Sequence, residues 1–288
     1  MSAPPYLIVG LAVVCVSVGS ILVRLAQAPA LAVSFHRVFL ATLLLTPFAG
    51  PRALSGWQAL PRRTRLALVA AGAALALHFG TWIASLSYTS VAASVLLVNA
   101  APLFTVAFSR VFLRERAPAR VLLAIAFALA GALLIAIGDW SSAGPAPLFG
   151  DALALAGAVA LAVYHVVGRG LRAALPLDAY LVWVWGTAAA LLGLAALAAG
   201  TPLIGHPPRA WAAFLALALV PTLAGHGLVN LSLRLLPAPT VGLFLLGEPV
   251  GATLLALALF GETPGGWTLA GGAVILASLV LVVTGSRT

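Results

Sequence analysis

The sequence predicts an all-α integral membrane protein with ten transmembrane helices, arranged as two inverted five-helix repeats. Three observations predict this class. Of the 288 residues, 63% are hydrophobic and only 7% are charged, whereas a soluble domain has about 25% charged residues. The apolar residues form runs of roughly 20 residues, each long enough to cross a hydrocarbon core of about 30 Å. The second half of the chain also repeats features of the first.

The predicted helices are separated by breaks that carry Pro, Gly, Arg or Trp. Their approximate ranges are 5–26, 31–50, 66–87, 91–112, 120–138, 150–168, 178–199, 211–233, 239–260 and 266–285. We interpret the first range as a retained helix and not as a signal peptide. Its leading segment Met1–Tyr6 lacks positive charge, and Arg24 lies where cleavage would occur.

The basic residues predict the orientation. All fifteen are arginines, and the net charge is +9. They form short clusters between apolar runs, so they do not indicate a nucleic-acid-binding face. With a cytoplasmic N-terminus, twelve arginines lie inside, Arg24 and Arg209 lie outside, and Arg37 lies within the second helix. The positive-inside rule therefore predicts that both termini are cytoplasmic.

A shift of 147 residues aligns the two halves. The coinciding pairs are Pro102 with Pro249, Glu115 with Glu262, and Gly138 with Gly285. We expect a first repeat at 1–140, a linker at 141–149 and a second repeat at 150–288. Each repeat holds an odd number of helices, so the second must be inverted in the membrane. Such inverted repeats place a substrate site near the midplane, between the halves.

Ionisable groups at membrane depth cost about 2.5–3.5 kcal/mol or more, so each is a candidate functional residue. Glu248 lies about eight residues into the ninth helix, or roughly 12 Å from its cytoplasmic end. Pro249 follows it and Pro102 lies in the fourth helix, and each proline frees a backbone carbonyl. These helix breaks can form a binding site. The alternative is close helix packing around a protonated or hydrogen-bonded Glu248.

Symmetric counting adds further candidates. His226 and Glu248 each lie eleven residues from Pro237, so we hypothesise that they share a proton at similar depth. The alternative for His226 is a structural hydrogen bond. His78 and Asn99 lie at equal distances from the turn between the third and fourth helices, which centres near Tyr88 and Thr89. Trp82 follows His78, and Asn230 follows His226, by four residues on the same helix face. A packing role is the alternative for Trp82. Such a cavity favours a cationic or zwitterionic solute.

Three more residues could line the cavity. Arg37 could bind a substrate carboxylate, or could snorkel or pair with a backbone carbonyl instead. His165, beside Tyr164 in the sixth helix, is a further candidate. Glu115 is expected to pair with a nearby arginine or to cap a helix. The single cysteine, Cys15, allows neither an intrachain disulfide nor a zinc ligand set. We therefore expect no metal and no cofactor.

Several segments resemble a known family. Ser94-Val95-Leu96-Leu97 with Pro102 and Glu115, and Glu248-Pro249-Val250 with Glu262, resemble the repeat ends of the EamA type of the drug/metabolite transporter (DMT) superfamily. Gly150-Asp151-Ala152-Leu153 and Phe35-His36-Arg37 are also similar. The resemblance implies ten helices, cytoplasmic termini, a central cavity and export or exchange of metabolites. It implies no particular substrate, because members move amino acids, drugs, sugars and nucleotide sugars.

The favoured function is secondary active transport of a small organic molecule, with proton coupling as a hypothesis. The sequence has no GxxxxGK[ST] motif, so ATP is not expected to drive transport. One alternative is a membrane-embedded enzyme that acts on lipid-like substrates, but paired carboxylates and HExxH are missing. Another is a non-transporting scaffold. The expected partners are a small molecule, protons and the lipid bilayer, without nucleic acid. The Ala-rich, all-Arg composition indicates a bacterial cytoplasmic membrane. The oligomeric state stays open.

Overall fold

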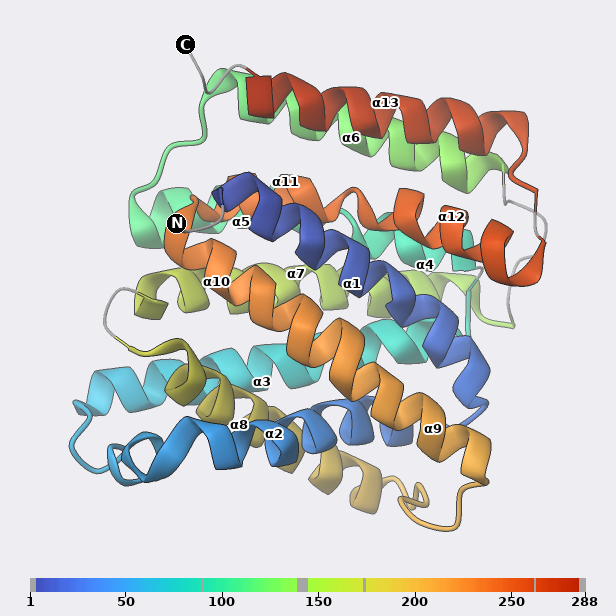
Figure 1. The fold of residues 1–288 in the computed structure, drawn as a ribbon. Coiled ribbons are helices and arrows are strands. Elements are labelled where there is room, and N and C mark those ends of the chain that lie inside the picture. Colours follow the sequence, from blue (N-terminus) through green and yellow to red (C-terminus); the bar gives the residue numbers. More distant parts are fainter. Residues whose placement is uncertain (1–3, 90, 139–144, 173–174, 262, 285–288) are drawn as a thin grey trace.

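The computed structural model describes residues 4–89, 91–138, 145–172, 175–261 and 263–284. Every regular element in these ranges is helical. The helices pack against one another as a single bundle, with α6 and α13 together along one edge (Figure 1). The predicted all-α class is therefore confirmed. Glu262 and Gly285, two of the repeat positions, lie outside the described residues, as do residues 141–144 of the predicted linker.

The helices follow the predicted order. The first half contains α1 (Pro5–Ala26), α2 (Ala30–Ser55), α3 (Arg62–Ser85), α4 (Val91–Val98), α5 (Ala101–Phe108), the π-helical segment η1 (Ser109–Leu113) and α6 (Ala119–Gly138). The second half contains α7 (Pro147–Arg172), α8 (Leu177–Ala198), α9 (Pro208–Leu217), the π-helical segment η2 (Ala218–His226), α10 (Gly227–Leu235), α11 (Ala238–Leu245), α12 (Glu248–Phe260) and α13 (Gly266–Thr284).

Consecutive elements combine into membrane-length spans. Eight helices of the described chain are long and apolar enough to cross a membrane, and two shorter apolar helices cover Ala119–Ile135 and Gly266–Val282. The fourth predicted span is built from α4, α5 and η1, the eighth from α9, η2 and α10, and the ninth from α11 and α12. Each of the ten predicted ranges thus has a helical counterpart.

Two of these spans are broken immediately before a proline. α4 ends at Val98, and α5 begins at Ala101 with Pro102 in its first turn. α11 ends at Leu245, and α12 begins at Glu248, directly before Pro249. A proline cannot donate a backbone hydrogen bond and its ring crowds the preceding turn, which explains why the helical ladder stops there.

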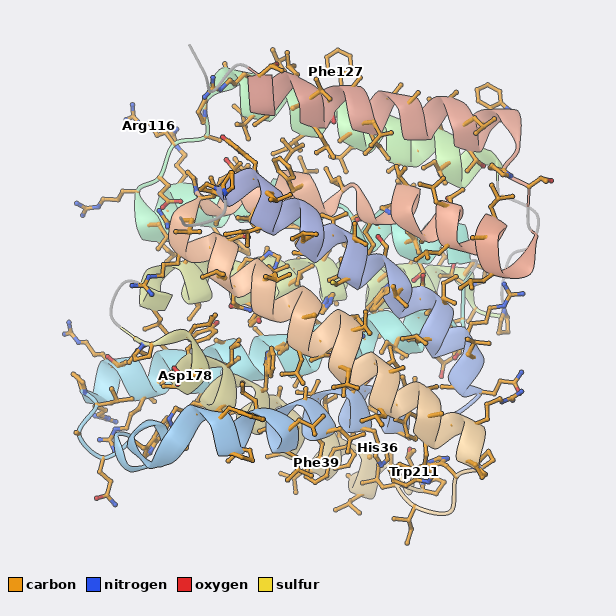
Figure 2. The ribbon with its side chains drawn as sticks, viewed as in Figure 1. His36, Phe39, Arg116, Phe127, Asp178 and Trp211 are labelled. Carbon is orange, nitrogen blue, oxygen red and sulfur yellow. The ribbon has the colours of Figure 1, made fainter. Side chains whose placement is uncertain are left out.

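The outer face of the bundle is apolar. Phe127 on α6, Phe39 on α2 and Trp211 on α9 are labelled among the projecting side chains (Figure 2). The Phe127 side chain is 56% exposed. A large apolar surface of this kind is covered by lipid in a membrane protein and would promote aggregation in water.

Small residues allow the helices to approach closely. A Cβ atom added to Gly72 in α3 would lie 2.5 Å from Thr187 Cβ in α8. One added to Gly131 in α6 would lie 2.6 Å from the Gly271 carbonyl oxygen in α13. Glycine at these crossings therefore sets the distance between helices, as is common in lipid.

We predict that Gly72→Ala and Gly131→Ala lower the thermal unfolding midpoint of the detergent-solubilised protein, because the added methyl groups overlap backbone or side-chain atoms. Overpacking of this kind costs about 1–3 kcal/mol. Gly10→Ala is the matched control, because a Cβ at Gly10 in α1 meets nothing within 4 Å. Equal midpoints for all three variants would contradict the packing described here.

Candidate functional site

A cavity lies at the centre of the bundle, between the two broken spans. Its empty volume is about 690 Å³, which includes open solvent at the mouth. Eight residues selected from the sequence line it: Arg37, His78, Trp82, Asn99, Pro102, His165, His226 and Glu248. The structure thus brings together candidates from α2, α3, the α4–α5 break, α7, η2 and α12.

The remaining three candidates lie behind the cavity wall. Asn230 and Tyr164 are fully buried, and Asn230 Nδ2 donates to the Tyr164 hydroxyl at 2.5 Å and to the His226 carbonyl at 2.7 Å. Pro249 is buried next to Glu248. These three residues do not line the cavity. They contact or adjoin the lining residues His226, His165 and Glu248.

The two helix breaks place polar groups on the cavity wall. The α4–α5 break exposes Asn99 and Pro102, and Asn99 Nδ2 donates to the Val95 carbonyl at 2.8 Å. The α11–α12 break places Glu248 at the first position of α12. A carboxylate at a helix N-terminus interacts favourably with the helix dipole. The break therefore provides a favourable position for a carboxylate that would otherwise be costly in the membrane interior.

Arg37 is the main cationic group of the cavity. Its side chain is 2% exposed, its Nε donates to Thr222 Oγ1 at 3.2 Å, and its guanidinium carbon lies 4.0 Å from the centroid of the Phe79 ring. Arg37 also interacts electrostatically with Glu248. The expectation that Arg37 snorkels is therefore wrong, because η2 and α3 hold the guanidinium inside the bundle. Among the described residues, its Nη1 atom has no hydrogen-bond partner.

Three histidines surround this pair. His78 is fixed by a 3.0 Å hydrogen bond between its Nδ1 and the Gly157 carbonyl, and its ring stacks on Trp82 with 5.9 Å between centroids. His165 Nδ1, His165 Nε2 and His226 Nδ1 have no hydrogen-bond partner within the described part of the chain. These nitrogen atoms are buried polar groups without a partner among the described residues, which is unusual for a side chain that has only a structural role.

Glu248, His226 and Arg37 all line the same cavity. Proton sharing between His226 and Glu248 stays a prediction. Arg37 is a second group on this cavity whose charge can act on the Glu248 carboxylate.

Three residues that shape the site were missed from the sequence. Phe79 packs against the Arg37 guanidinium, and Thr222 accepts its hydrogen bond. Ser17 Oγ in α1 lies 3.2 Å from the Glu248 carbonyl oxygen and helps to position the start of α12. A hydroxyl directly after Pro221 in an apolar run was a usable signal for Thr222. Phe79 and Ser17 carried none, because apolar and small residues are common throughout the chain.

Comparison with known proteins agrees with this architecture. The model of the EamA-like transporter family matches twice, at residues 4–137 and 148–284. A solved crystal structure of a protein superposes with a TM-score of 0.79 at 21% sequence identity, over 98% of this chain and 97% of that chain. No curated protein matches. The structural likeness is evidence for the fold alone.

The family match covers nearly all of both halves, and a multi-pass helical bundle is the fold that such a protein needs. Members of this family are membrane transporters and not enzymes. The chain belongs to the EamA-like transporter family of the drug/metabolite transporter superfamily.

Proposed function

We propose that this protein is a secondary active transporter that moves a small cationic or zwitterionic organic molecule through the central cavity. The observation that carries the proposal is the placement of Arg37 and Glu248 on one cavity between two broken helices. Ionisable groups that line a cavity inside the membrane, one of them at a broken helix, are typical of substrate sites in secondary transporters.

The charged groups suggest how such a solute would bind. Arg37 Nη1 can donate to an anionic group, and Glu248 can accept from a cationic one. The His78–Trp82 stack offers an apolar surface for the rest of the molecule. A solute carboxylate would compete with Glu248 for Arg37, so solute binding would favour protonation of Glu248. This competition is the proposed basis for proton coupling.

The packing supports two inverted five-helix halves. α2 packs against α8, α5 against α11 and α6 against α13, so each of these spans contacts its own counterpart in the other half. α3 packs along α7, and α1 packs in the equivalent way along α9, η2 and α10. A twofold relation between the halves would produce these pairings, and alternating access would follow from rocking of one half against the other.

The orientation proposal combines the arginine bias with the fold. α1 begins and α13 ends at the same edge of the bundle (Figure 1). Arg116, which projects from the loop after η1, lies at that edge as well (Figure 2). By the positive-inside rule this edge faces the cytoplasm, in the cytoplasmic membrane of a bacterium.

We predict proton-linked transport by the protein in liposomes that contain a trapped pH-sensitive dye. Amino acids, amines, cationic drugs and nucleosides form the test panel. One class should change the internal pH with the wild type and fail to do so with Glu248→Gln, because the amide cannot exchange a proton. Asp178→Asn is the matched control, since Asp178 lies on α8 outside the cavity lining.

Three results are informative. A pH response lost only in Glu248→Gln supports proton coupling at this carboxylate. An unchanged response in Glu248→Gln would reject Glu248 as the proton site. If no compound class moves, as measured also with radiolabelled solutes, the transport proposal itself fails.

We predict that Arg37 and Glu248 are energetically coupled. Arg37→Met leaves the partly buried Glu248 carboxylate without the positive charge that acts on it, and the double variant Arg37→Met/Glu248→Gln removes both charges. The double variant should be less destabilised than the sum of the single variants, with a coupling of roughly 0.5–3 kcal/mol. Unfolding in detergent measures this cycle, and additive effects would argue against the pairing.

We predict opposite sidedness for two single cysteines introduced into a Cys15→Ala background. Arg116→Cys should react with an impermeant maleimide from the cytoplasmic side. Leu148→Cys, at the start of α7 where the side chain is 86% exposed, should react from the outside. Intact spheroplasts and inverted vesicles separate the two sides. The reverse pattern would invert the proposed orientation.

A further inference from the structure

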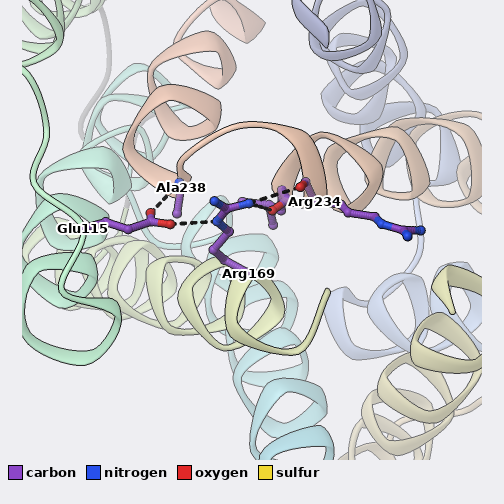
Figure 3. Close-up of polar contacts among 5 residues, drawn as sticks. Glu115, Arg169, Arg234 and Ala238 are labelled. Atoms are coloured by element: carbon purple, nitrogen blue, oxygen red, sulfur yellow. Dashed lines mark hydrogen bonds and ion pairs between the residues drawn. The ribbon is translucent and has the colours of Figure 1, made fainter. Parts of the chain in front are cut away.

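A second charged cluster, centred on Glu115 and Arg169, is outside the cavity lining (Figure 3). It lies where α10 meets α11, at the edge of the bundle where α1 begins (Figure 1). Arg169 Nε donates to Glu115 Oε1 at 2.8 Å, which confirms the expected pairing of Glu115 with an arginine. Arg169 Nη1 donates to the carbonyl oxygen atoms of Leu233 at 2.8 Å and Arg234 at 3.2 Å. The Ala238 amide donates to Glu115 Oε2 at 3.4 Å. We call these five residues the clamp.

The clamp joins three segments from both halves of the chain. Glu115 follows η1 in the first half, and Arg169 lies in the last turn of α7. Leu233 and Arg234 lie in the last turn of α10, and Ala238 is the first residue of α11. The two charged side chains are 26% and 23% exposed, and an ion pair at such a position adds little stability by itself. Its bonds to backbone atoms instead fix where the three segments lie, because they satisfy polar groups at helix ends.

A thin layer separates the clamp from the cavity. His165 in α7 and His226 at the end of η2 line the cavity, and the Asn230–Tyr164 hydrogen bond lies next to them. Arg169 is four residues beyond His165, or about 6 Å along the helix axis. Leu233 is seven residues beyond His226, or about 10 Å. The clamp and the Asn230–Tyr164 pair therefore close the seam between α7 and α10 on this side of the cavity.

We propose that the clamp is the cytoplasmic gate of the transporter, and that it must open for the cavity to reach the cytoplasm. The proposal rests on the proposed transport function and orientation. The clamp holds the half that contains Glu115 against the turn between α10 and α11. Breaking it shifts the population toward the state that is open to the cytoplasm, since a conformational equilibrium moves when contacts specific to one state are lost.

The test measures access to the cavity with one reporter cysteine. Thr105→Cys in a Cys15→Ala background places a thiol on the cavity wall, where Thr105 now bonds to the Ala101 carbonyl. A small charged methanethiosulfonate reagent is added to inverted or right-side-out vesicles. Glu115→Gln and Arg169→Gln are introduced separately, so that either one can test the gate if the other fails to fold, as judged by size-exclusion chromatography.

The gate predicts reciprocal changes in labelling. Both variants should react about fivefold or more faster from the cytoplasmic side, a typical size for a conformational coupling, and more slowly from the outside. Asp151→Asn is the control for Glu115→Gln, because it likewise replaces a carboxylate by an amide, at the other end of α7, where Asp151 Oδ1 accepts from Thr89 Oγ1. Arg116→Gln is the control for Arg169→Gln, because Arg116 is exposed. Neither control should raise the cytoplasmic rate.

Three outcomes would overturn the gate. They are unchanged cytoplasmic labelling in both clamp variants, faster labelling from both sides, and an equal increase in the Arg116→Gln control. Labelling requires no substrate, so a failed gate leaves the transport proposal standing. Even if the protein transports none of the tested solutes, the labelling rates still show from which side the clamp closes the cavity.

Discussion

In the hydrocarbon core of a membrane, backbone polar groups must find partners inside the protein. This constraint explains both the regularity of the bundle and the position of its exceptions. Continuous helices satisfy their own backbone, and an interrupted helix is tolerated only where it is buried in protein or lines a cavity. The two breaks, before Pro102 and Pro249, lie on the same central cavity. The cavity is therefore located where the helices can be interrupted, because backbone groups that lose their helical partner face the cavity and not lipid.

The same cavity collects the ionisable groups. An isolated arginine in the interior would be costly, but Arg37 is stabilised by the Thr222 hydroxyl, the Phe79 ring and the charge of Glu248. Each contact comes from a different span, so the arginine also ties α2 to α3 and η2. A solute that supplied its own anionic group would exchange one partner of Arg37 for another. Replacing one anionic partner of Arg37 by another costs less free energy than leaving the guanidinium without any partner. Binding of such a solute can therefore be reversible.

Binding at the midplane becomes transport only if access alternates between the two sides. Close contacts at Gly72 and Gly131 hold two helix pairs, α3 with α8 and α6 with α13, tightly together. Polar contacts at the edge of the bundle can instead exchange their partners for water. The clamp of Glu115 and Arg169 is of this kind, because both side chains are partly exposed. The α7–α10 seam thus contains two parts, a buried Asn230–Tyr164 bond near the cavity and an ion pair at the edge.

The helical class, the ten spans and the positions of both helix breaks could be predicted from the sequence. These features follow from local chemistry, namely apolar run length and the missing amide of proline. Most of the polar residues that line the cavity were also predicted, because a polar side chain in the membrane interior is costly unless it lies inside the bundle. Glu248, His78 and Asn99 were recognisable for that reason.

Which residues come together depends on contacts between distant helices. Equal counting from Pro237 predicted that His226 and Glu248 lie at similar depth, and both residues line the cavity. Counting did not predict that η2, which ends at His226, is π-helical. Arg37 and Thr222 are 185 residues apart in sequence, and Phe79 looks like any other apolar residue of its run. Contacts of this kind depend on how whole helices rotate and cross, and the balance of packing that sets those rotations is distributed over the entire bundle.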